Sequence, residues 1–400
     1  MMNEREVSQV VFQALDIMNA RTVKEFQVPP DTCMGGGAIA RIGEAVASRG
    51  IDNVFVVIDE VVENLGLADG MFRSLGYSGI SYCECKQPAG EPRSDTVEQE
   101  ARRFTESGCT GMIAIGGGSA MDAAKGIAVL AANPGLTVAD MLEPSNIRNR
   151  RAPFIAVPTT AGTGSEATCV TVITDCGTHR KQVIAHPSLV PDLALIDACL
   201  MLRVPPSVTA ATGIDALTHS VEAYVATKAT PLTKALAFQA LRLIGEALPI
   251  AVGQGGNIAA RESMALASYM AGMAFSNAGL GLTHSMAHQI GPKYGIPHGM
   301  ANSILLPSIM EFNKLVCRKE YREVGFALTG KLLSASDSIA AVQRMILELG
   351  LPRNLDVVGG KAEDFDALAD AAMRDYCLPT NPRTVLKQQI VETYLHALQK

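Results

Sequence analysis

Histidine and aspartate side chains gather in two short stretches of this chain. Asp215 and His219 stand four residues apart in TGIDALTHSVEAY, and His284 and His288 stand four apart in GLTHSMAHQIGPKYGIPHGMAN, which also contains His298. Residues four apart on a helix project from the same face, so each stretch offers a pair of neighbouring side chains. Imidazoles with one carboxylate suit a divalent transition metal such as Fe²⁺, Zn²⁺ or Ni²⁺. By local spacing alone, His284 and His288 form the natural ligand pair of the second stretch.

A glycine-rich turn earlier in the chain suits a phosphate. Gly116, Gly117, Gly118 and Ser119 lie between the strand-like segment GMIAIGGG and a helix-like segment that carries Asp122. Glycine lets the backbone approach a pyrophosphate closely, and a helix N-terminus supplies free N–H groups. The turn is not the GxGxxG fingerprint, and a tight strand-to-helix turn without a ligand is the alternative.

A second loop, PTTAGTGSE at 158–166, places small hydroxylated residues between glycines. Such residues suit contacts to a phosphate or a ribose, and they strengthen the case for a nucleotide. The residues concerned are Thr159, Thr160, Thr163 and Ser165. A Ser/Thr-rich turn without a ligand is the alternative.

Asp59 ends the first strand-like segment, NVFVVID. A carboxylate there accepts hydrogen bonds from ribose hydroxyls and repels a 2′-phosphate, which favours NAD over NADP. The usual acid follows its glycines by about 20 residues. Asp59 instead precedes Gly116 by 57 residues, so an ordinary strand-end cap is an equal alternative. Lys181 either reaches the cofactor or lies at a strand edge.

The composition excludes several other classes of function. A net charge of −6 over 400 residues leaves no basic surplus for a nucleic-acid partner. Nine scattered cysteines argue against a disulfide framework and favour a reducing cytosol. No apolar run reaches the ~18 residues of a membrane span. The one basic cluster, Arg148, Arg150 and Arg151, is expected in a solvated surface loop.

Apolar strands alternate with helical stretches in the first half of the chain and give way to long helical patterns in the second. The expected strands are 53–59, 111–118, 152–160 and 192–198, and the expected long helices are 207–226, 233–252, 257–277 and 300–316. This pattern predicts an α/β, Rossmann-like dinucleotide-binding domain at 1–203, led by an amphipathic helix at 1–20, and an all-helical metal-binding domain at 204–400. The phosphate motifs fall in one domain and the histidines in the other, so the active site is expected in a cleft between them.

Together these motifs resemble the iron-containing (group III) alcohol dehydrogenase family over about residues 22–398. The resemblance implies the two-domain, dehydroquinate synthase-like fold of that family. The ethanolamine-utilisation branch is most similar, and the propanediol oxidoreductase (lactaldehyde reductase) branch follows. The motifs are, in order, GGGSxxDxAK at 116–125, PTTAGTGSE at 158–166, GIDALTHxxEAY at 213–224, GMAFSNAGLGLTHSMAH at 272–288 and IPHGMAN at 296–302.

The resemblance also implies a role for each histidine of the two stretches. His288 would lie near the substrate without binding the metal, against the choice that local spacing favours. Pro297 interrupts the helix before His298, so the chain turns back toward His284. Fe²⁺ is the implied metal, with Zn²⁺ or Mn²⁺ as substitutes. The implied ligands are Asp215, His219, His284 and His298.

The expected reaction interconverts a short-chain primary alcohol and its aldehyde. Hydride would pass between the carbinol carbon and NAD, with the cation as Lewis acid and His288 relaying a proton. Phe275 and Cys377 match positions that line the substrate pocket in the family, with plain core packing as the alternative. The competing functions are a lactaldehyde/1,2-propanediol oxidoreductase, a zinc-dependent polyol (glycerol) dehydrogenase or dehydroquinate synthase of the same architecture, and a non-enzymatic metal- or NAD-binding protein.

Assembly and location follow only from the resemblance. A cytoplasmic homodimer or larger homo-oligomer is expected. Residues 1–20 either bind the shell of a bacterial microcompartment or cover the protein's own hydrophobic surface. His179, His186 and His396 lie outside the motifs and are expected to be structural or surface residues.

Overall fold

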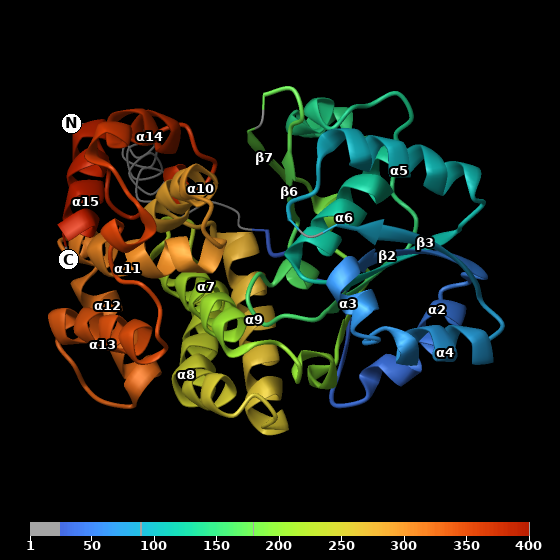
Figure 1. The fold of residues 1–400 in the computed structure, drawn as a ribbon, viewed down its shortest axis with the longest axis horizontal. Helices are drawn as coiled ribbons and strands as arrows, with labels where there is room; N and C mark the ends of the chain where they lie inside the picture. Colours follow the sequence, from blue (N-terminus) through green and yellow to red (C-terminus); the bar gives the residue numbers. More distant parts are fainter. Residues whose placement is uncertain (1–24, 89, 179, 400) are drawn as a thin grey trace, which may run out of the picture.

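The computed structural model describes residues 25–88, 90–178 and 180–399. The predicted helix at 1–20 and His179 lie outside the described residues. Within them, the chain forms a sheet-containing half and a helical half that lie side by side (Figure 1).

The first half forms a six-stranded parallel sheet. Four strands coincide with the predicted segments, whereas the edge strands β1 and β3 were not predicted because their exposed, polar side chains make no apolar run. In spatial order the strands are β1 (Asp31–Met34), β8 (Leu193–Ile196), β5 (Phe154–Pro158), β4 (Gly111–Gly116), β2 (Asn53–Asp59) and β3 (Ser81–Gln87).

Helices cover both faces of this sheet, and the internal strand β2 has apolar side chains on both faces. Phe55 and Val57 pack in the same core as α5 (Ser94–Glu106) and α6 (Gly118–Ala132). The alternate residues Val54, Val56 and Ile58 pack with α2 (Ile42–Ala47) and α4 (Asp69–Tyr77) on the other face. A parallel strand covered on both sides reads as a continuous apolar run, which is why the sequence predicted it. Figure 1 shows this three-layer arrangement.

The strand order changes direction between β2 and β4. From β2 the chain runs through the short helix α3 (Glu60–Asn64) and α4 to β3 at one edge, and then returns to place β4 on the other side of β2. Ile58 pairs with Ile115, so the carboxyl ends of β2 and β4 lie together. In open α/β sheets, ligands bind at such a switch point.

A two-stranded antiparallel hairpin stands apart from the main sheet. It consists of β6 (Val170–Thr174) and β7 (Lys181–Ala185), and it was not predicted. Ile173 and Ile184 bury one side of the hairpin in the core that includes α6. This packing orients the hairpin beside the start of α6, where its other residues reach the site described below.

The second half is built from helices, and no described residue after Ile196 lies in a strand. The four predicted long helices are confirmed as α7 to α9 and α11. The domain boundary at 203–204 stays a prediction, although β8 ends at Ile196 and α7 begins at Pro206. The helices are α7 (Pro206–Val225), α8 (Pro231–Gly253), α9 (Ile258–Ala278), α10 (Leu282–Tyr294), α11 (His298–Asn313), α12 (Arg318–Thr329), α13 (Ala335–Glu348), α14 (Phe365–Ala372) and α15 (Lys387–Gln399).

By length and composition alone, α8 could cross a membrane, with a mean hydropathy of 1.5 over its most apolar window. Its buried residues, including Leu241, Ile244 and Leu248, pack in the helical core with α7 and α9. Core helices of globular proteins commonly have this character, so the observation is weak evidence for a membrane span.

The prediction for the basic cluster is wrong for Arg151. Arg148 and Arg150 are exposed as expected, but Arg151 is buried and its guanidinium lies 2.5 Å from the Asp192 carboxylate. Asp192 also accepts a hydrogen bond from Phe154 N, so the pair ties the start of β5 to the start of β8. Local charge patterning could not reveal this pair because its partners are 41 residues apart.

Candidate active site

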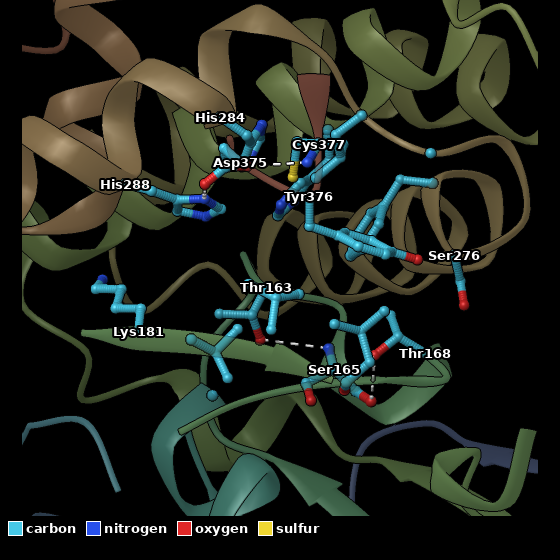
Figure 2. A pocket seen from close by; sticks show the side chains of 18 of the residues that line it. Thr163, Ser165, Thr168, Lys181, Ser276, His284, His288, Asp375, Tyr376 and Cys377 are labelled. Atoms are coloured by element: carbon cyan, nitrogen blue, oxygen red, sulfur yellow. Dashed lines mark hydrogen bonds and ion pairs between the residues drawn. The ribbon is translucent and has the colours of Figure 1, made fainter. Parts of the chain in front are cut away.

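One cavity of about 630 Å³ lies between the two halves and receives residues from both. Gly118, Ser119 and Thr163 line it from the sheet half, while His284 and His288 line it from the helical half. Figure 2 shows the hydroxylated side chains on one wall facing the histidines on the other. A cavity thus lies between the two halves, where the active site was expected.

Three helices bring four predicted ligand side chains together. Asp215 and His219 lie on α7, His284 on α10, and His298 is the first residue of α11. Asp215 Oδ1 lies 3.7 Å from His219 Nε2, 3.6 Å from His284 Nε2 and 3.5 Å from His298 Nε2. Ligands about 2.1 Å from a metal in a tetrahedron are about 3.4 Å apart. The donor types and the mutual spacing of Asp215, His284 and His298 therefore fit one divalent transition metal, and His219 adjoins them through Asp215.

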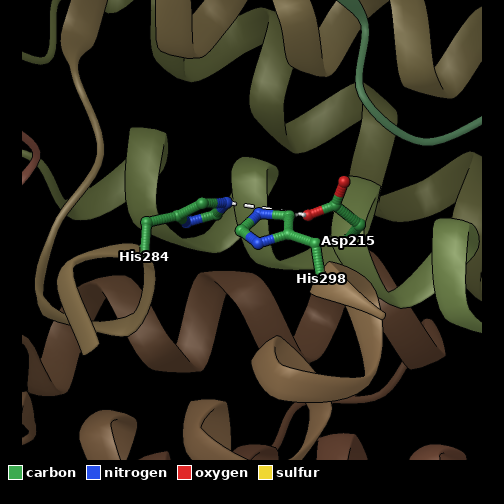
Figure 3. Close-up of side chains that lie close together, drawn as sticks. All are labelled: Asp215, His284 and His298. Carbon is green, nitrogen blue, oxygen red and sulfur yellow. Dashed lines mark ion pairs between the residues drawn. The ribbon is translucent and has the colours of Figure 1, made fainter. Parts of the chain in front are cut away.

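Close backbone packing makes this convergence possible. After α10, Gly295 and Pro297 turn the chain, and α11 then starts with His298, as expected from the proline. Gly299 lies so close to α7 that a Cβ there would be 2.0 Å from Ala211 O. Only glycine permits this approach, which places His298 beside Asp215 (Figure 3).

His219 occupies the edge of the cluster. The ligand atoms of Asp215, His284 and His298 all lie within 4.8 Å of one another, and His219 joins them through Asp215. Its ring is stacked between Phe275, with centroids 4.3 Å apart, and His284, with centroids 4.6 Å apart. This stacking fixes the plane of the His219 ring.

His288 lies outside the cluster formed by Asp215, His284 and His298. Its Nδ1 is 2.9 Å from Asp375 Oδ2, and its ring stacks on His298 with centroids 5.3 Å apart. The sequence reasoning missed Asp375, which precedes Cys377 by two residues and carries no recognisable local signal. The geometry thus separates His288 from His284, contrary to the pairing that local spacing suggested.

The charges of the cluster are strongly coupled. Burial alone would raise the pKa of Asp215, but the surrounding histidines hold it well below its usual range. Burial lowers the pKa of His219 to about 4 and that of His298 well below its ordinary value. Burial also disfavours charge on His284, but Asp215 and Glu222 raise its pKa to about 9. His219 and His298 are thus neutral at pH 7, the form in which imidazole binds a metal.

Asn302 contacts the same cluster and was also missed. Its Nδ2 donates to Asp215 Oδ1 at 2.8 Å and lies 3.2 Å from His298 Nε2 and 3.4 Å from His284 Nε2. Its buried Oδ1 has no hydrogen-bond partner among the described residues. The available signal was its position four residues after His298 on the same helix face.

On the opposite wall, the two predicted loops lie together at the start of α6. Gly117 precedes this helix without a side-chain cap, so its first N–H groups are free for an anion. A Cβ on Gly118 would lie 2.9 Å from Thr163 Cγ2, and one on Gly117 would lie 3.6 Å from Thr160 Oγ1. The cavity is lined by Gly118, Ser119, Asp122, Thr163, Ser165 and Lys181, whereas Asp59, Gly116, Gly117, Thr159 and Thr160 lie just outside its lining.

Asp59 keeps both of its predicted alternatives. A Cβ on Gly116 would lie 2.7 Å from Asp59 Cβ, so the parallel sheet brings the acid beside the glycine turn despite their separation in sequence. Its Oδ1 accepts a hydrogen bond from Val61 N at 2.8 Å and therefore also caps α3.

Lys125, a buried residue of α6, links the helix that follows the glycine turn to the 158–166 loop. Its buried Nζ donates to Ser165 Oγ at 3.0 Å, to Thr168 Oγ1 at 2.8 Å and to the carbonyl oxygens of Thr168 and Val170. Ser165 Oγ in turn donates to Asp122, whose other carboxylate oxygen accepts from Val172 N. The side chains of Ser165 and Asp122 are thus engaged within the protein at the cavity wall.

The remaining predicted residues divide between the cavity and other places. Lys181 lines the cavity and forms an ion pair with Glu91. Phe275 and Cys377 line it from the helical half. His186 follows β7 and accepts a hydrogen bond from Ser188 N, and His396 is exposed on α15. Neither of these two histidines lines the cavity.

Comparisons with known proteins identify the family of this chain. Residues 29–198 match the family described as iron-containing alcohol dehydrogenase, and residues 209–398 match the C-terminal part of the Fe-containing alcohol dehydrogenase family. The probable alcohol dehydrogenase EutG of Salmonella typhimurium is 49% identical over 98% of this chain and 100% of its own length. The NAD-dependent methanol dehydrogenase of Bacillus methanolicus is 37% identical over 93% of this chain and 99% of its own.

A solved structure gives the same result for the fold. The crystal structure of a 1,3-propanediol oxidoreductase matches with a TM-score of 0.90 and 35% identity, over 94% of this chain and 100% of that one. Because both halves match in order and near-full-length relatives are this similar, the chain belongs to the iron-containing alcohol dehydrogenase family.

Proposed function

We propose that this chain interconverts a short-chain primary alcohol and its aldehyde with NAD, at a site that holds Fe²⁺. The observation that carries the proposal is the shared cavity. A phosphate-type helix N-terminus lies on one wall, and a cluster of one aspartate and three histidines lies on the other. Hydride transfer requires a nicotinamide and a polarised carbinol or carbonyl group at one place. In this cavity one wall would bind the cofactor and the other the metal that polarises the substrate.

Asp215, His219, His284 and His298 are the proposed metal ligands, and Zn²⁺ or Mn²⁺ are the proposed substitutes for Fe²⁺. When bound, the cation would supply Lewis acidity to the substrate oxygen. The protein's own part is to hold the four ligands in place, with Asp215, His219 and His284 buried and His298 half-buried. Asn302 supports this by donating to Asp215, and Phe275 does so by stacking on His219.

The proposed NAD site lies along the cavity wall that the sheet half forms. The free N–H groups at Gly118 and Ser119 would hold the pyrophosphate, and Thr163 lies against the same turn. Asp59, at the end of β2, is the proposed ribose acceptor. Its charge would disfavour a 2′-phosphate and hence NADP.

His288 is the proposed proton carrier between the cavity and solvent. A carboxylate only accepts hydrogen bonds, so Asp375 holds a proton on Nδ1 of the neutral ring. Nε2 is then the atom that takes or gives a proton during turnover. This arrangement keeps the ring oriented while the substrate changes between alcohol and aldehyde.

The proposed substrate lies beside Phe275 and Cys377. These side chains present an apolar surface close to the metal ligands, which favours a short alkyl group. The resemblance to the ethanolamine-utilisation branch makes ethanol and acetaldehyde the first pair to test. A cytoplasmic homo-oligomer, inside a bacterial microcompartment or free, is the proposed setting.

The test is anaerobic NADH oxidation by metal-stripped protein after Fe²⁺ or Zn²⁺ is restored. Acetaldehyde, propionaldehyde and lactaldehyde form the aldehyde panel, and glycerol with NAD tests the polyol alternative. Turnover of an aldehyde that returns with Fe²⁺ supports the proposal and ranks the substrates. NADH binding without turnover of any aldehyde would contradict it, and zinc-restored glycerol oxidation would replace it with a polyol dehydrogenase.

A further inference from the structure

We propose that Glu222 is a positioning residue of the metal site, and that it holds His284 in the tautomer whose Nε2 is free to bind a cation. The inference rests on the proposed function, because it concerns the same cluster. Glu222 is not itself one of the proposed ligands and acts on the metal site through His284.

Glu222 shares one helix face with two of the proposed ligands. Asp215, His219 and Glu222 stand at positions i, i+4 and i+7 of α7, so their side chains project in the same direction. Glu222 is 5% exposed, and its Oε2 lies 2.6 Å from His284 Nδ1. One helix therefore supplies two ligands and also the carboxylate that contacts a third.

The contact decides which ring nitrogen of His284 carries a proton. An ionised carboxylate has no proton to donate, so Nδ1 must be the donor in this pair. In the neutral imidazole, Nε2 is then left with a free lone pair, and it lies 3.6 Å from Asp215 Oδ1 inside the cluster. Carboxylate partners of this kind orient metal-binding histidines and raise their basicity.

Glu222 also contacts the backbone of α10, and these contacts must be separated from the one with Nδ1. Its Oε1 accepts from Thr283 N at 2.6 Å and its Oε2 accepts from His284 N at 3.4 Å, in the first turn of α10, which begins after Gly281 without a side-chain cap from its own N-cap residue. A carboxylate beside a helix N-terminus is stabilising in itself. A purely structural role would therefore explain the burial of Glu222, but it would not require the contact with Nδ1.

The Glu222→Gln variant separates the two roles. Its amide oxygen can still accept from Thr283 N, which retains the shorter of the two backbone contacts with α10. Its NH₂ group would then face His284 Nδ1 and must donate to it, which moves the imidazole proton to Nε2, the ligand atom. The affinity for Zn²⁺ is expected to fall by about 10–100-fold.

The measurement uses full-length, metal-stripped protein and competition for Zn²⁺ with a chromophoric chelator. Far-UV circular dichroism and NADH binding check that the variant folds. The matched control is Glu323→Gln. Glu323 Oε2 also accepts a hydrogen bond from a residue of α7, Tyr224, at 2.7 Å, but within the described part of the chain Glu323 makes no hydrogen bond to a residue of the cluster. The control is expected to bind Zn²⁺ within about twofold of wild type.

Wild-type zinc affinity in a folded Glu222→Gln variant would overturn the inference and leave Glu222 as a helix cap alone. Failure of the wild-type protein to bind Zn²⁺ or Fe²⁺ would remove the proposed metal site and the inference with it. If Glu222→Gln does not fold, Glu222→Asp decides, because it keeps the charge near α10 but draws the carboxylate back from Nδ1 by one methylene. Its zinc affinity is expected to fall, and an unchanged affinity would overturn the inference.

Discussion

Gly164 and Gly272 touch where the 158–166 loop packs against α9. A Cβ on Gly272 of α9 would lie 2.5 Å from Gly164 O, and Gly164 itself has a φ of +60° that favours glycine. Gly164 separates Thr163 from Ser165, and Phe275 stands three residues beyond Gly272. This glycine pair therefore sets the distance between the loop at the cavity wall and the helix that supports His219.

We expect Gly272→Ala to push the 158–166 loop away from α9. Overpacking of this kind lowers the free energy of unfolding by about 1–3 kcal/mol. Because the displaced loop carries Thr163, NADH affinity should fall as well. Urea unfolding and NADH titration of the metal-loaded protein measure the two effects.

The matched control for this change is Gly76→Ala. Gly76 also lies in a helix, α4, but a Cβ there would meet nothing within 4 Å. Alanine at such a position should raise the free energy of unfolding by about 0.5–1 kcal/mol. If Gly272→Ala resembled this control in both measurements, the contact between Gly272 and Gly164 would not govern the position of the 158–166 loop.

His288→Ala should retain the metal and lose turnover. Removal of a proton-transfer group lowers kcat by about 10²–10⁴-fold, and Asp375→Asn should lower kcat in the same direction but less, because the imidazole remains. Metal content and kcat are measured on the same anaerobic sample. Loss of the metal from His288→Ala would instead make His288 a ligand, as the spacing of His284 and His288 alone suggested.

Local sequence patterns predicted what depends on neighbours along the chain. The buried strand β2, the long helices and the i, i+4 pair of Asp215 and His219 all belong to this class. The patterns could not predict contacts that the fold creates between distant residues, such as Arg151 with Asp192, or Glu222 with His284 across 62 residues. The ligand set came from the family resemblance, because spacing alone favoured His288 over His298.

Asp59 illustrates the same limit and yields a further prediction. Parallel pairing of β2 with β4 places Asp59 beside Gly116, which its position in sequence did not suggest. Asp59→Asn keeps an oxygen for Val61 N and so retains the cap of α3, but it removes the charge that would repel a 2′-phosphate. The ratio of kcat/KM with NADH to that with NADPH should fall by about tenfold or more, in line with the loss of one charge–charge repulsion. An unchanged ratio in steady-state assays with both cofactors would leave Asp59 as a helix cap only.

Glu166 is buried at the end of the 158–166 loop, and its titration should make the stability of the protein depend on pH. Burial raises its pKa from the ordinary value of 4.5 to about 7, although Lys125 acts in the opposite direction. The folded state then holds a proton that the unfolded state has released between these values. The contribution of Glu166 to the free energy of unfolding should therefore be highest below pH 4.5 and fall as pH rises through this window to about 7.

Glu166→Gln should remove this dependence, because glutamine has nearly the same shape and no charge. The interval from 4.5 to about 7 corresponds to an upper value of about 3 kcal/mol. The variant should therefore be more stable than wild type at pH 8 by up to that amount and similar to it at pH 4.5. Urea unfolding of metal-free wild type and variant from pH 4.5 to 8 measures the difference in their free energies of unfolding. Because all other titrating groups are common to both proteins, their contributions cancel in this difference. A difference that stays constant with pH would mean that Glu166 is ionised in the folded protein throughout, held in that form by Lys125.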